Sequence, residues 1–285
     1  MLHYVQYWHM YGHYIHDFLS SMMFVPQELM EKGILVASPK KSIKAVKDLV
    51  KYLGLNITFL KMKKDEQIYV KKLWIVHTLE LGHGYASGGF TRMRKLIMEK
   101  VDFNKIKPTR FVLADRPPKS GRNFENPKLM LKYLNDYTVI DKGCKWVRDD
   151  KFFGVPVEQI VKYWQSIKVL VTLQGSGIYN AIFMHEKCGM CLVFSSINDG
   201  PNLHLCTHLH IFLIGVIHPR RAHKSREPQV TNYTLMVQYT QRVVDTVNQG
   251  NWTSMEGIHV FLKEAPIVTN VSHFVRNYKD FTKNW

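Results

Sequence analysis

A short turn with two glycines, Gln174-Gly175-Ser176-Gly177, interrupts an apolar stretch in the carboxyl-terminal half of the chain. The pattern before the turn predicts a buried strand, and the apolar spacing after it predicts a helix. A glycine loop between a strand and a helix is a common phosphate site, because the first turn of the helix has unpaired N–H groups and a positive dipole end. An ordinary tight turn is the alternative, since the residues lack the Lys-Ser/Thr of a P-loop and the full dinucleotide spacing.

A polar loop at residues 115–126 contains three basic residues, Arg116, Lys119 and Arg122. The loop follows a predicted strand and precedes a predicted helix, so we expect it at the same carboxyl edge of a sheet as the glycine turn. One guanidinium group can bind two phosphate oxygens at once, and it keeps its charge when it is desolvated. A site for a nucleotide diphosphate requires both properties. The alternative interpretation is a solvated basic loop without a ligand.

His9, His13 and Asp17 occur at four-residue steps and therefore line one face of a predicted helix. In a group transfer to a hydroxyl, one side chain must take the hydroxyl proton, and His13 paired with Asp17, or Asp17 alone, has the chemistry to do this. Two further interpretations remain. Asp17 caps a neighbouring segment while His13 packs in a wall between domains, or the three side chains bind a metal ion.

A second group of potential metal ligands consists of Cys188, Cys191, His204, Cys206, His208 and His210. If the last four lie on a strand, alternate side chains share a face and complete a zinc site with the Cys-x-x-Cys pair. However, Cys191 lies in the apolar run MCLVF, where a small buried residue is expected. Core packing is therefore the favoured interpretation of these cysteines.

The helices and strands that position these residues alternate along the chain. We expect helices at residues 7–31, 42–53, 90–99, 127–134, 155–166, 177–185 and 235–249. We expect strands at residues 34–37, 57–60, 72–76, 110–114, 138–140, 169–173 and 190–194. Asn126 and Pro127 fit the N-cap and the first position of a helix. The repeated strand, helix, strand order in the second half predicts a parallel sheet with right-handed crossovers.

The composition describes a basic globular protein. The 285 residues include 39 Lys+Arg against 23 Asp+Glu, a formal net charge of +16. This charge favours polyanionic partners, phosphorylated small molecules or an anionic membrane surface. No apolar run approaches the roughly 20 residues of a spanning helix, and no signal peptide is visible. We therefore expect no transmembrane segment in this chain.

The compartment is indicated by acceptor sites for N-glycosylation. Asn56, Asn232, Asn251 and Asn270 each begin an Asn-x-Ser/Thr sequence. This is more than the one or two expected by chance, and it favours a lumenal protein. The remaining cysteine, Cys144, brings the number to four, and the three possible disulfide pairings stay open.

Three blocks of sequence occur in a specific order: MYGHYIHDF from residue 10, RPPKSGRNFEN from residue 116 and VLVTLQGSGIYNAIFM from residue 169. Together they resemble the glycosyltransferase 61 family, also called the domain of unknown function 563. In that family, a helix with His-x-x-x-Asp is followed by a loop with Arg and Arg-x-x-x-Asn, and then by a His-Gly-Ala-Gly-like loop after a strand.

The resemblance implies an α/β fold of the GT-B type, with two Rossmann-like lobes and an interdomain cleft. Residues 1–108 would form the amino-terminal lobe on the acceptor side, and residues 109–285 the lobe that binds the nucleotide sugar. The helix at residues 235–249 would return toward the first lobe. The implied activity is an inverting transfer from UDP-N-acetylglucosamine or UDP-xylose to a protein-linked glycan or polysaccharide, in the Golgi or ER lumen. No metal or other cofactor is required.

The implied donor-binding residues are Arg116, Arg122, Asn126, Gln174, Gly175, Ser176 and Gly177, and the implied catalytic residues are Asp17 and His13. Gln174 and Ser176 replace the family's His and Ala, and glutamine can hydrogen-bond but cannot carry a charge. An inactive binding protein of the same fold is therefore an alternative. A nucleic-acid-binding protein ranks last, because the basic residues are spread along the chain and no nucleic-acid motif occurs.

Overall fold

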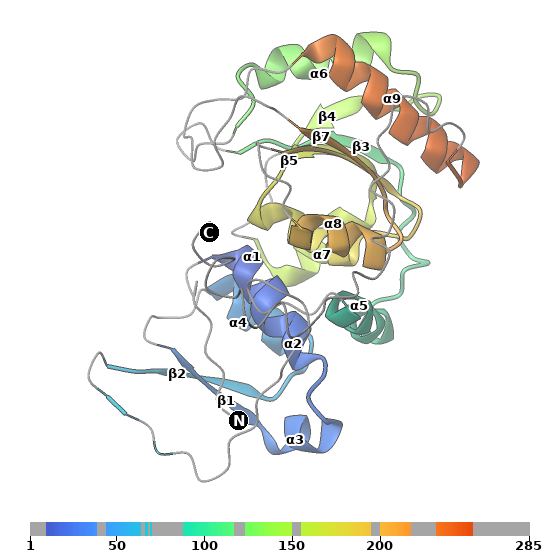
Figure 1. Cartoon of the computed structure of the whole chain (residues 1–285). Helices are drawn as coiled ribbons and strands as arrows, with labels where there is room; N and C mark the ends of the chain where they lie inside the picture. The colour runs from blue at the N-terminus through green and yellow to red at the C-terminus, as the bar shows by residue number, and fades with distance from the viewer. Residues whose placement is uncertain are drawn as a thin grey trace, which may run out of the picture. The chain divides into compact units, whose positions relative to one another are not determined.

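The computed structural model describes residues 10–38, 44–63, 66–67, 69, 88–116, 123–149, 155–194, 200–217 and 232–252. The chain divides into one compact unit, Met1–Asn251, and a second, Trp252–Trp285. All described helices and strands belong to the first unit (Figure 1). None of these helices has both the length and the apolar character needed to cross a bilayer.

Five parallel strands form the main sheet, in the order β4-β3-β5-β6-β7. They are β3 Arg110–Leu113, β4 Trp146–Arg148, β5 Ile167–Leu173, β6 Gly189–Phe194 and β7 Phe212–Ile217. β5 and β6 are apolar and almost wholly buried, as expected for parallel strands that are covered on both faces. The predicted parallel α/β class is confirmed.

Helices cover both faces of this sheet (Figure 1). α6 Pro127–Tyr137 and α9 Tyr233–Gln249 lie on one face, and α7 Val157–Gln165, α8 Gly200–His208 and the 3-10 helix η3 Ser176–Phe183 lie on the other. α9 packs against β5, β6, β7 and α6. The apolar face of this helix is buried on the main sheet, and its expected return to the amino-terminal lobe stays a prediction.

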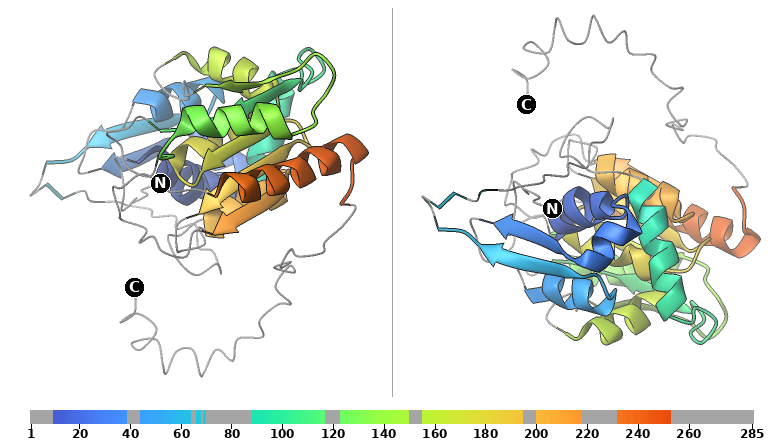
Figure 2. Two further views of the ribbon diagram at one scale, coloured as in Figure 1. Left: turned by 90° about the horizontal axis from the view of Figure 1, so that it is seen from above. Right: turned by 90° about the horizontal axis from the view of Figure 1, so that it is seen from below.

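The amino-terminal residues form a second, two-stranded parallel sheet from β1 Ile34–Ser38 and β2 Ile57–Lys61, joined through α4 Lys44–Tyr52. α5 Gly88–Lys100 lies alongside the amino-terminal helix (Figure 2). Apolar side chains of both sheets belong to one contiguous core, for example Val36 of β1 and Leu170 of β5. The lobe boundary at residue 108 stays a prediction.

The first described helix is continuous but changes its type along its length. It consists of α1 Tyr11–His13, the π-helix η1 Tyr14–Leu19 and α2 Ser20–Met22. The prediction of one helix through residue 31 is wrong, because the chain turns after Met22 and begins α3 Gln27–Lys32 after Pro26. Proline disfavours a helical conformation in the residue before it, which explains the break. α3 ends at Gly33, as predicted, with a φ of +92°.

Three further predictions differ from the structure. Residues 138–140 are not a strand, because the Gln241 side chain binds both the N–H and the carbonyl of Val139, at 2.7 and 3.1 Å. The helix predicted after the glycine turn is present but is a 3-10 helix rather than an α-helix. His204, Cys206 and His208 lie on α8 and not on a strand. The strand predicted at residues 72–76 lies outside the described residues.

Candidate functional site

The strand order reverses direction at the boundary between β3 and β5. From β3 the chain passes through α6 to β4 on one side, and from β5 it passes through η3 to β6 on the other. In open α/β sheets, the crevice outside the carboxyl ends of the strands at such a reversal is the usual ligand site. Arg116 follows β3 and Gly175 follows β5. The sheet therefore brings the predicted basic loop and the predicted glycine turn to the same carboxyl edge, between β3 and β5.

Arg116 and Gly175 are in direct contact at this edge. A Cβ atom built on Gly175 would come within 1.7 Å of Arg116 Nη2 and 2.8 Å of its Cζ. Gly175 also has a φ of +142°, which L side chains rarely adopt. The guanidinium thus occupies the space that any side chain at position 175 would need. Glycine is required here both by the backbone conformation and by the approach of a cation.

A buried carboxylate, Asp115, holds the basic loop at both of its ends. Its Oδ1 accepts hydrogen bonds from the backbone N–H groups of Arg116, at 2.8 Å, and Phe124, at 3.0 Å. Arg148 Nη2 lies 3.9 Å from the other carboxylate oxygen. Asp115 is absent from the predicted site, although an acidic residue directly after a buried strand was an available signal. Lys119 and Arg122 lie between these ends, outside the described residues.

Side chains of α8 and η3 hold the glycine turn in place through hydrogen bonds. Gly175 N–H donates to Asn202 Oδ1 at 3.4 Å, and Asn202 Nδ2 donates to the Tyr179 hydroxyl at 3.1 Å. Asn202 is fully buried, so it fixes the turn from within the core. Ser176 and Gly177 begin η3 and are partly exposed. Their N–H groups precede the first helical hydrogen bonds and are available to an anion.

Two predicted donor residues have structural roles of their own. Gln174 is buried, and its backbone N–H donates to the Val193 carbonyl at 2.9 Å, which extends the pairing of β5 with β6. Asn126 Oδ1 accepts a hydrogen bond from Leu129 N–H at 3.0 Å, so the predicted N-cap of α6 is confirmed. Donor contacts of these two side chains stay predictions.

The amino-terminal helix packs directly on η3, next to the glycine turn. A Cβ atom on Gly12 would come within 2.9 Å of Tyr179 Cε2 and 3.0 Å of Ser176 Oγ. One residue earlier, the Tyr11 hydroxyl donates to Asn180 Oδ1 at 2.6 Å. This contact was not predicted, and it brings the segment with His13 and Asp17 to the glycine turn.

A carboxylate and two imidazoles form the titratable group of this segment. His13 Nδ1 lies 2.7 Å from Asp17 Oδ2, and His16 Nδ1 lies 2.6 Å from Asp17 Oδ1. Burial alone would raise the pKa of the Asp17 carboxyl, but hydrogen bonds and charges from both histidines outweigh it, so this pKa lies below its usual value. His16 was missed, although it lies three residues after His13 in the same helix. His9 lies outside the described residues.

The arrangement determines which nitrogen atoms can act as bases. An ionised Asp17 only accepts hydrogen bonds, so a neutral His13 ring that bonds to it donates from Nδ1–H and has its lone pair on Nε2. The His16 ring packs on Tyr179, with ring centroids 5.1 Å apart, and is 5% exposed. His13 is more exposed. Its Nε2 is thus the better placed of the two to take a proton from a bound molecule.

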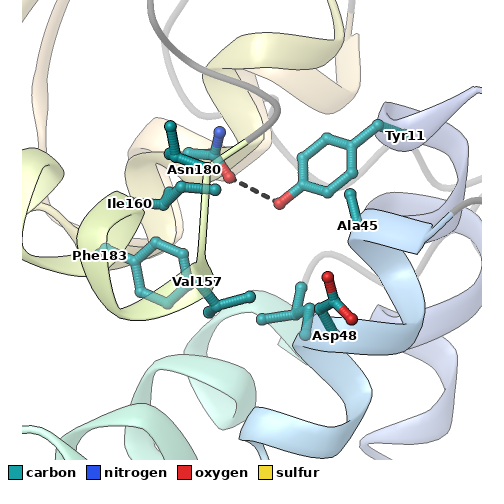
Figure 3. A pocket seen from close by; sticks show the side chains of 9 residues that line it. Tyr11, Ala45, Asp48, Val157, Ile160, Asn180 and Phe183 are labelled. Carbon is teal, nitrogen blue, oxygen red and sulfur yellow. Dashed lines mark hydrogen bonds between the residues drawn. The ribbon is translucent and has the colours of Figure 1, made fainter.

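A small cavity lies next to the contact between the amino-terminal helix and η3 (Figure 3). Its wall includes the Tyr11–Asn180 hydrogen bond, the Asp48 carboxylate and the apolar side chains of Val157 and Phe183. A volume of about 20 Å³ suits one ordered water molecule but no sugar ring. The cavity is therefore part of the packing, and the carboxyl edge of the main sheet is the candidate site.

The cysteines do not form the alternative zinc site. Cys188, Cys191 and Cys206 are buried thiols, and burial raises the pKa of each to about 12. The histidines next to Cys206 are on a helix, so alternate positions do not share a face. Core packing of these cysteines is confirmed.

Comparison with known proteins agrees with this geometry. Residues 11–191 match the family model described as Glycosyltransferase 61. The match spans the amino-terminal helix, the basic loop and the glycine turn, and it covers more than half of the 285 residues. The comparison with curated proteins gives no match. The chain belongs to the glycosyltransferase 61 family.

Proposed function

We propose that the protein transfers a sugar from a UDP-sugar, UDP-N-acetylglucosamine or UDP-xylose, to a hydroxyl of a protein-linked glycan or polysaccharide. The observation that carries this proposal is the contact of Arg116 with Gly175 at the reversal of strand order. A cation, a glycine turn and the start of a helix meet there, which is the combination that a diphosphate requires. Family membership supports glycosyltransferase activity.

The donor diphosphate would bind at the open edge between β3 and β5. Arg116 would pair with its oxygens, and the N–H groups of Ser176 and Gly177 would donate to them. We also assign Arg122 to this site, with Asn126, Gln174 and Gly175 around it. In a reaction without a required metal, these groups must stabilise the charge that develops on the departing UDP.

The acceptor would be activated by the carboxylate and imidazole group. As the acceptor oxygen forms its bond to the anomeric carbon, its proton passes to His13 Nε2, and Asp17 stabilises the resulting imidazolium. The bond between the anomeric carbon and the diphosphate oxygen breaks at the same time, and UDP leaves with the electron pair. Attack opposite to the leaving group inverts the configuration at that carbon.

The cellular setting is part of the same proposal. We place the protein in the lumen of the ER or Golgi, in a two-lobed GT-B arrangement. Members of the family are typically enzymes of the secretory pathway. The acceptor asparagines Asn56, Asn232 and Asn251 are exposed on the structure, so their glycosylation would disturb no core. Detection of N-glycans on the protein from eukaryotic cells, and their loss in Asn→Gln variants, would test this placement.

The transfer is tested with purified protein, each UDP-sugar and a panel of glycan acceptors, with and without EDTA. We expect UDP release with a matching increase in acceptor mass, and no need for added metal. Asp17→Asn removes the carboxylate that stabilises the His13 imidazolium and should reduce the rate by about 10²- to 10⁴-fold, the range for loss of general-base catalysis. Asp136→Asn, on the exposed face of α6, is the matched control and should keep full activity. Absence of product and of UDP release with every donor would favour the inactive binding protein.

A further inference from the structure

His13, His16 and Asp17 also form a group of potential metal ligands. Each residue offers one ligand atom, a ring nitrogen from either histidine or a carboxylate oxygen, and these atoms all lie within 4.8 Å of one another. Asp17 is 6% exposed and His16 is 5% exposed, whereas His13 opens toward the surface. A buried carboxylate must be paired to offset the cost of its desolvation. In the part of the chain that the structure describes, the partners of this carboxylate are the two imidazoles.

The helix geometry explains why three ligands converge. Residues 13, 16 and 17 lie within one turn, at the start of the π-helix Tyr14–Leu19, and π-helices occur frequently at functional sites. The wider turn lets both imidazoles reach opposite oxygens of the same carboxylate. A cation at this point would bind the ring nitrogens and carboxylate oxygens that now face one another.

We propose that His13, His16 and Asp17 bind Zn²⁺, and that bound zinc switches the enzyme off. Two nitrogen ligands and one carboxylate suit Zn²⁺, whereas Mg²⁺ and Ca²⁺ prefer oxygen ligands alone. An imidazole that binds zinc through Nδ1 carries its proton on Nε2. His13 then has no lone pair with which to take the acceptor proton, so the ion inhibits by changing the tautomer of the base.

Metal binding can be measured without any substrate. We would titrate the metal-free protein with Zn²⁺ in a calorimeter and with Co²⁺ while following its visible absorption bands. The expected result is one tightly bound ion in the wild type. His16→Gln should weaken zinc binding by at least about 100-fold, since even outer-shell changes alter metal affinity 10- to 100-fold. Thermal unfolding of this variant shows whether it is folded, and His13→Gln, at the more exposed position, provides the same test if it is not.

A second histidine pair provides the matched control. His204 and His208 lie one turn apart on α8, with ring centroids 6.4 Å apart, and could bind zinc at the surface. The double variant His204→Ala/His208→Ala should keep the tight site. The proposal is overturned if the wild type binds Zn²⁺ no more tightly than His16→Gln, or if the α8 variant is the one that loses binding.

Inhibition, unlike binding, rests on the proposed function. Zn²⁺ should abolish sugar transfer, EDTA should restore it, and Mg²⁺ or Ca²⁺ at the same concentration should have no effect. Tight zinc binding by a protein without transferase activity would support the metal site and contradict the proposed sugar transfer. Transfer that zinc does not inhibit, in a protein that does not bind zinc, would overturn the metal site alone.

Discussion

The guanidinium of Arg116 lies where a side chain on Gly175 would be, 1.7 Å from the ideal Cβ position. The two residues are 59 positions apart in the sequence, and the adjacency of β3 and β5 brings them together. Because the Arg116 guanidinium lies against the Gly175 backbone, it can bind the same ligand as the N–H groups of Ser176 and Gly177. This contact links the fold of the protein to the donor site that we propose.

Gly175→Ala should therefore displace Arg116 as well as strain the backbone. We expect UDP affinity to fall by at least about tenfold, which corresponds to the loss of about 1.4 kcal/mol. Gly143→Ala is the matched control, because Gly143 also has a positive φ, +81°, but a Cβ there meets nothing within 4 Å. The control should lose about 1 kcal/mol of unfolding free energy and keep its UDP affinity. Urea unfolding and calorimetry with UDP measure the two effects. Equal UDP affinity in both variants would contradict the role of the contact.

Asp115 should act as the positioning residue of the basic loop. Asp115→Ala leaves two N–H groups, of Arg116 and Phe124, without their acceptor. Each buried group without a partner costs about 1–3 kcal/mol. We expect a lower urea midpoint and weaker UDP binding. Asp115→Asn keeps an acceptor oxygen, so it should recover most of the stability. If Asp115→Ala binds UDP as tightly as the wild type, the loop is held by other contacts.

The hydrogen bond from Tyr11 to Asn180 should anchor the amino-terminal helix on η3. Tyr11→Phe leaves the buried Asn180 Oδ1 without this 2.6 Å donor, at a cost of about 1–3 kcal/mol in unfolding free energy. Tyr137→Phe is the control, since that side chain is 64% exposed, and its effect should stay within about 0.5 kcal/mol. Urea unfolding distinguishes the two. Similar losses in both variants would show that the Tyr11 hydroxyl contributes nothing specific.

His185 should make the protein less stable in weak acid. Burial, with a smaller contribution from the Arg94 cation, lowers the pKa of His185, and this outweighs the opposing effect of the hydrogen bond between its Nε2 and the Ile106 carbonyl. The folded protein then binds the proton less well than the unfolded chain, whose histidines have a pKa of about 6.5. The stabilising contribution of the neutral His185 ring is therefore complete above a pH of about 6.5 and is lost as the pH falls below it.

We would test this by measuring the urea midpoint of unfolding at pH values from about 7.5 to about 5. His185→Gln has no titrating ring, so its midpoint should fall less steeply with acid than that of the wild type. Parallel curves for the two proteins would show that His185 is not responsible.

Local patterns were sufficient to predict the parts that meet at the candidate site. The buried strand before Gly175 and the Asn126-Pro127 start of α6 depend on neighbouring residues, and the structure confirms both. The adjacency of the basic loop and the glycine turn followed from the rule that parallel strands end at one edge.

Contacts between distant residues were beyond those patterns. Residues 138–140 were predicted as a strand because nothing nearby indicates that Gln241, 102 residues away, binds Val139. The approach of Gly12 to Ser176 depends on how two helices pack. The pairing of His16 with Asp17 is local, but it depends on a π-helical turn that the apolar spacing did not predict. Asp115 likewise gains its role only when Phe124 folds back onto it.

The most direct test of the account is donor binding by wild-type protein and by Arg116→Ala. We would measure the thermal unfolding of both with UDP, UDP-N-acetylglucosamine and UDP-xylose, in the presence of EDTA. A ligand at 100 times its dissociation constant adds about 2.7 kcal/mol of stability. We predict such a gain for the wild type with at least one of the UDP-sugars, and its loss in Arg116→Ala. If millimolar nucleotide stabilises neither protein, or both equally, the carboxyl edge between β3 and β5 is not the donor site.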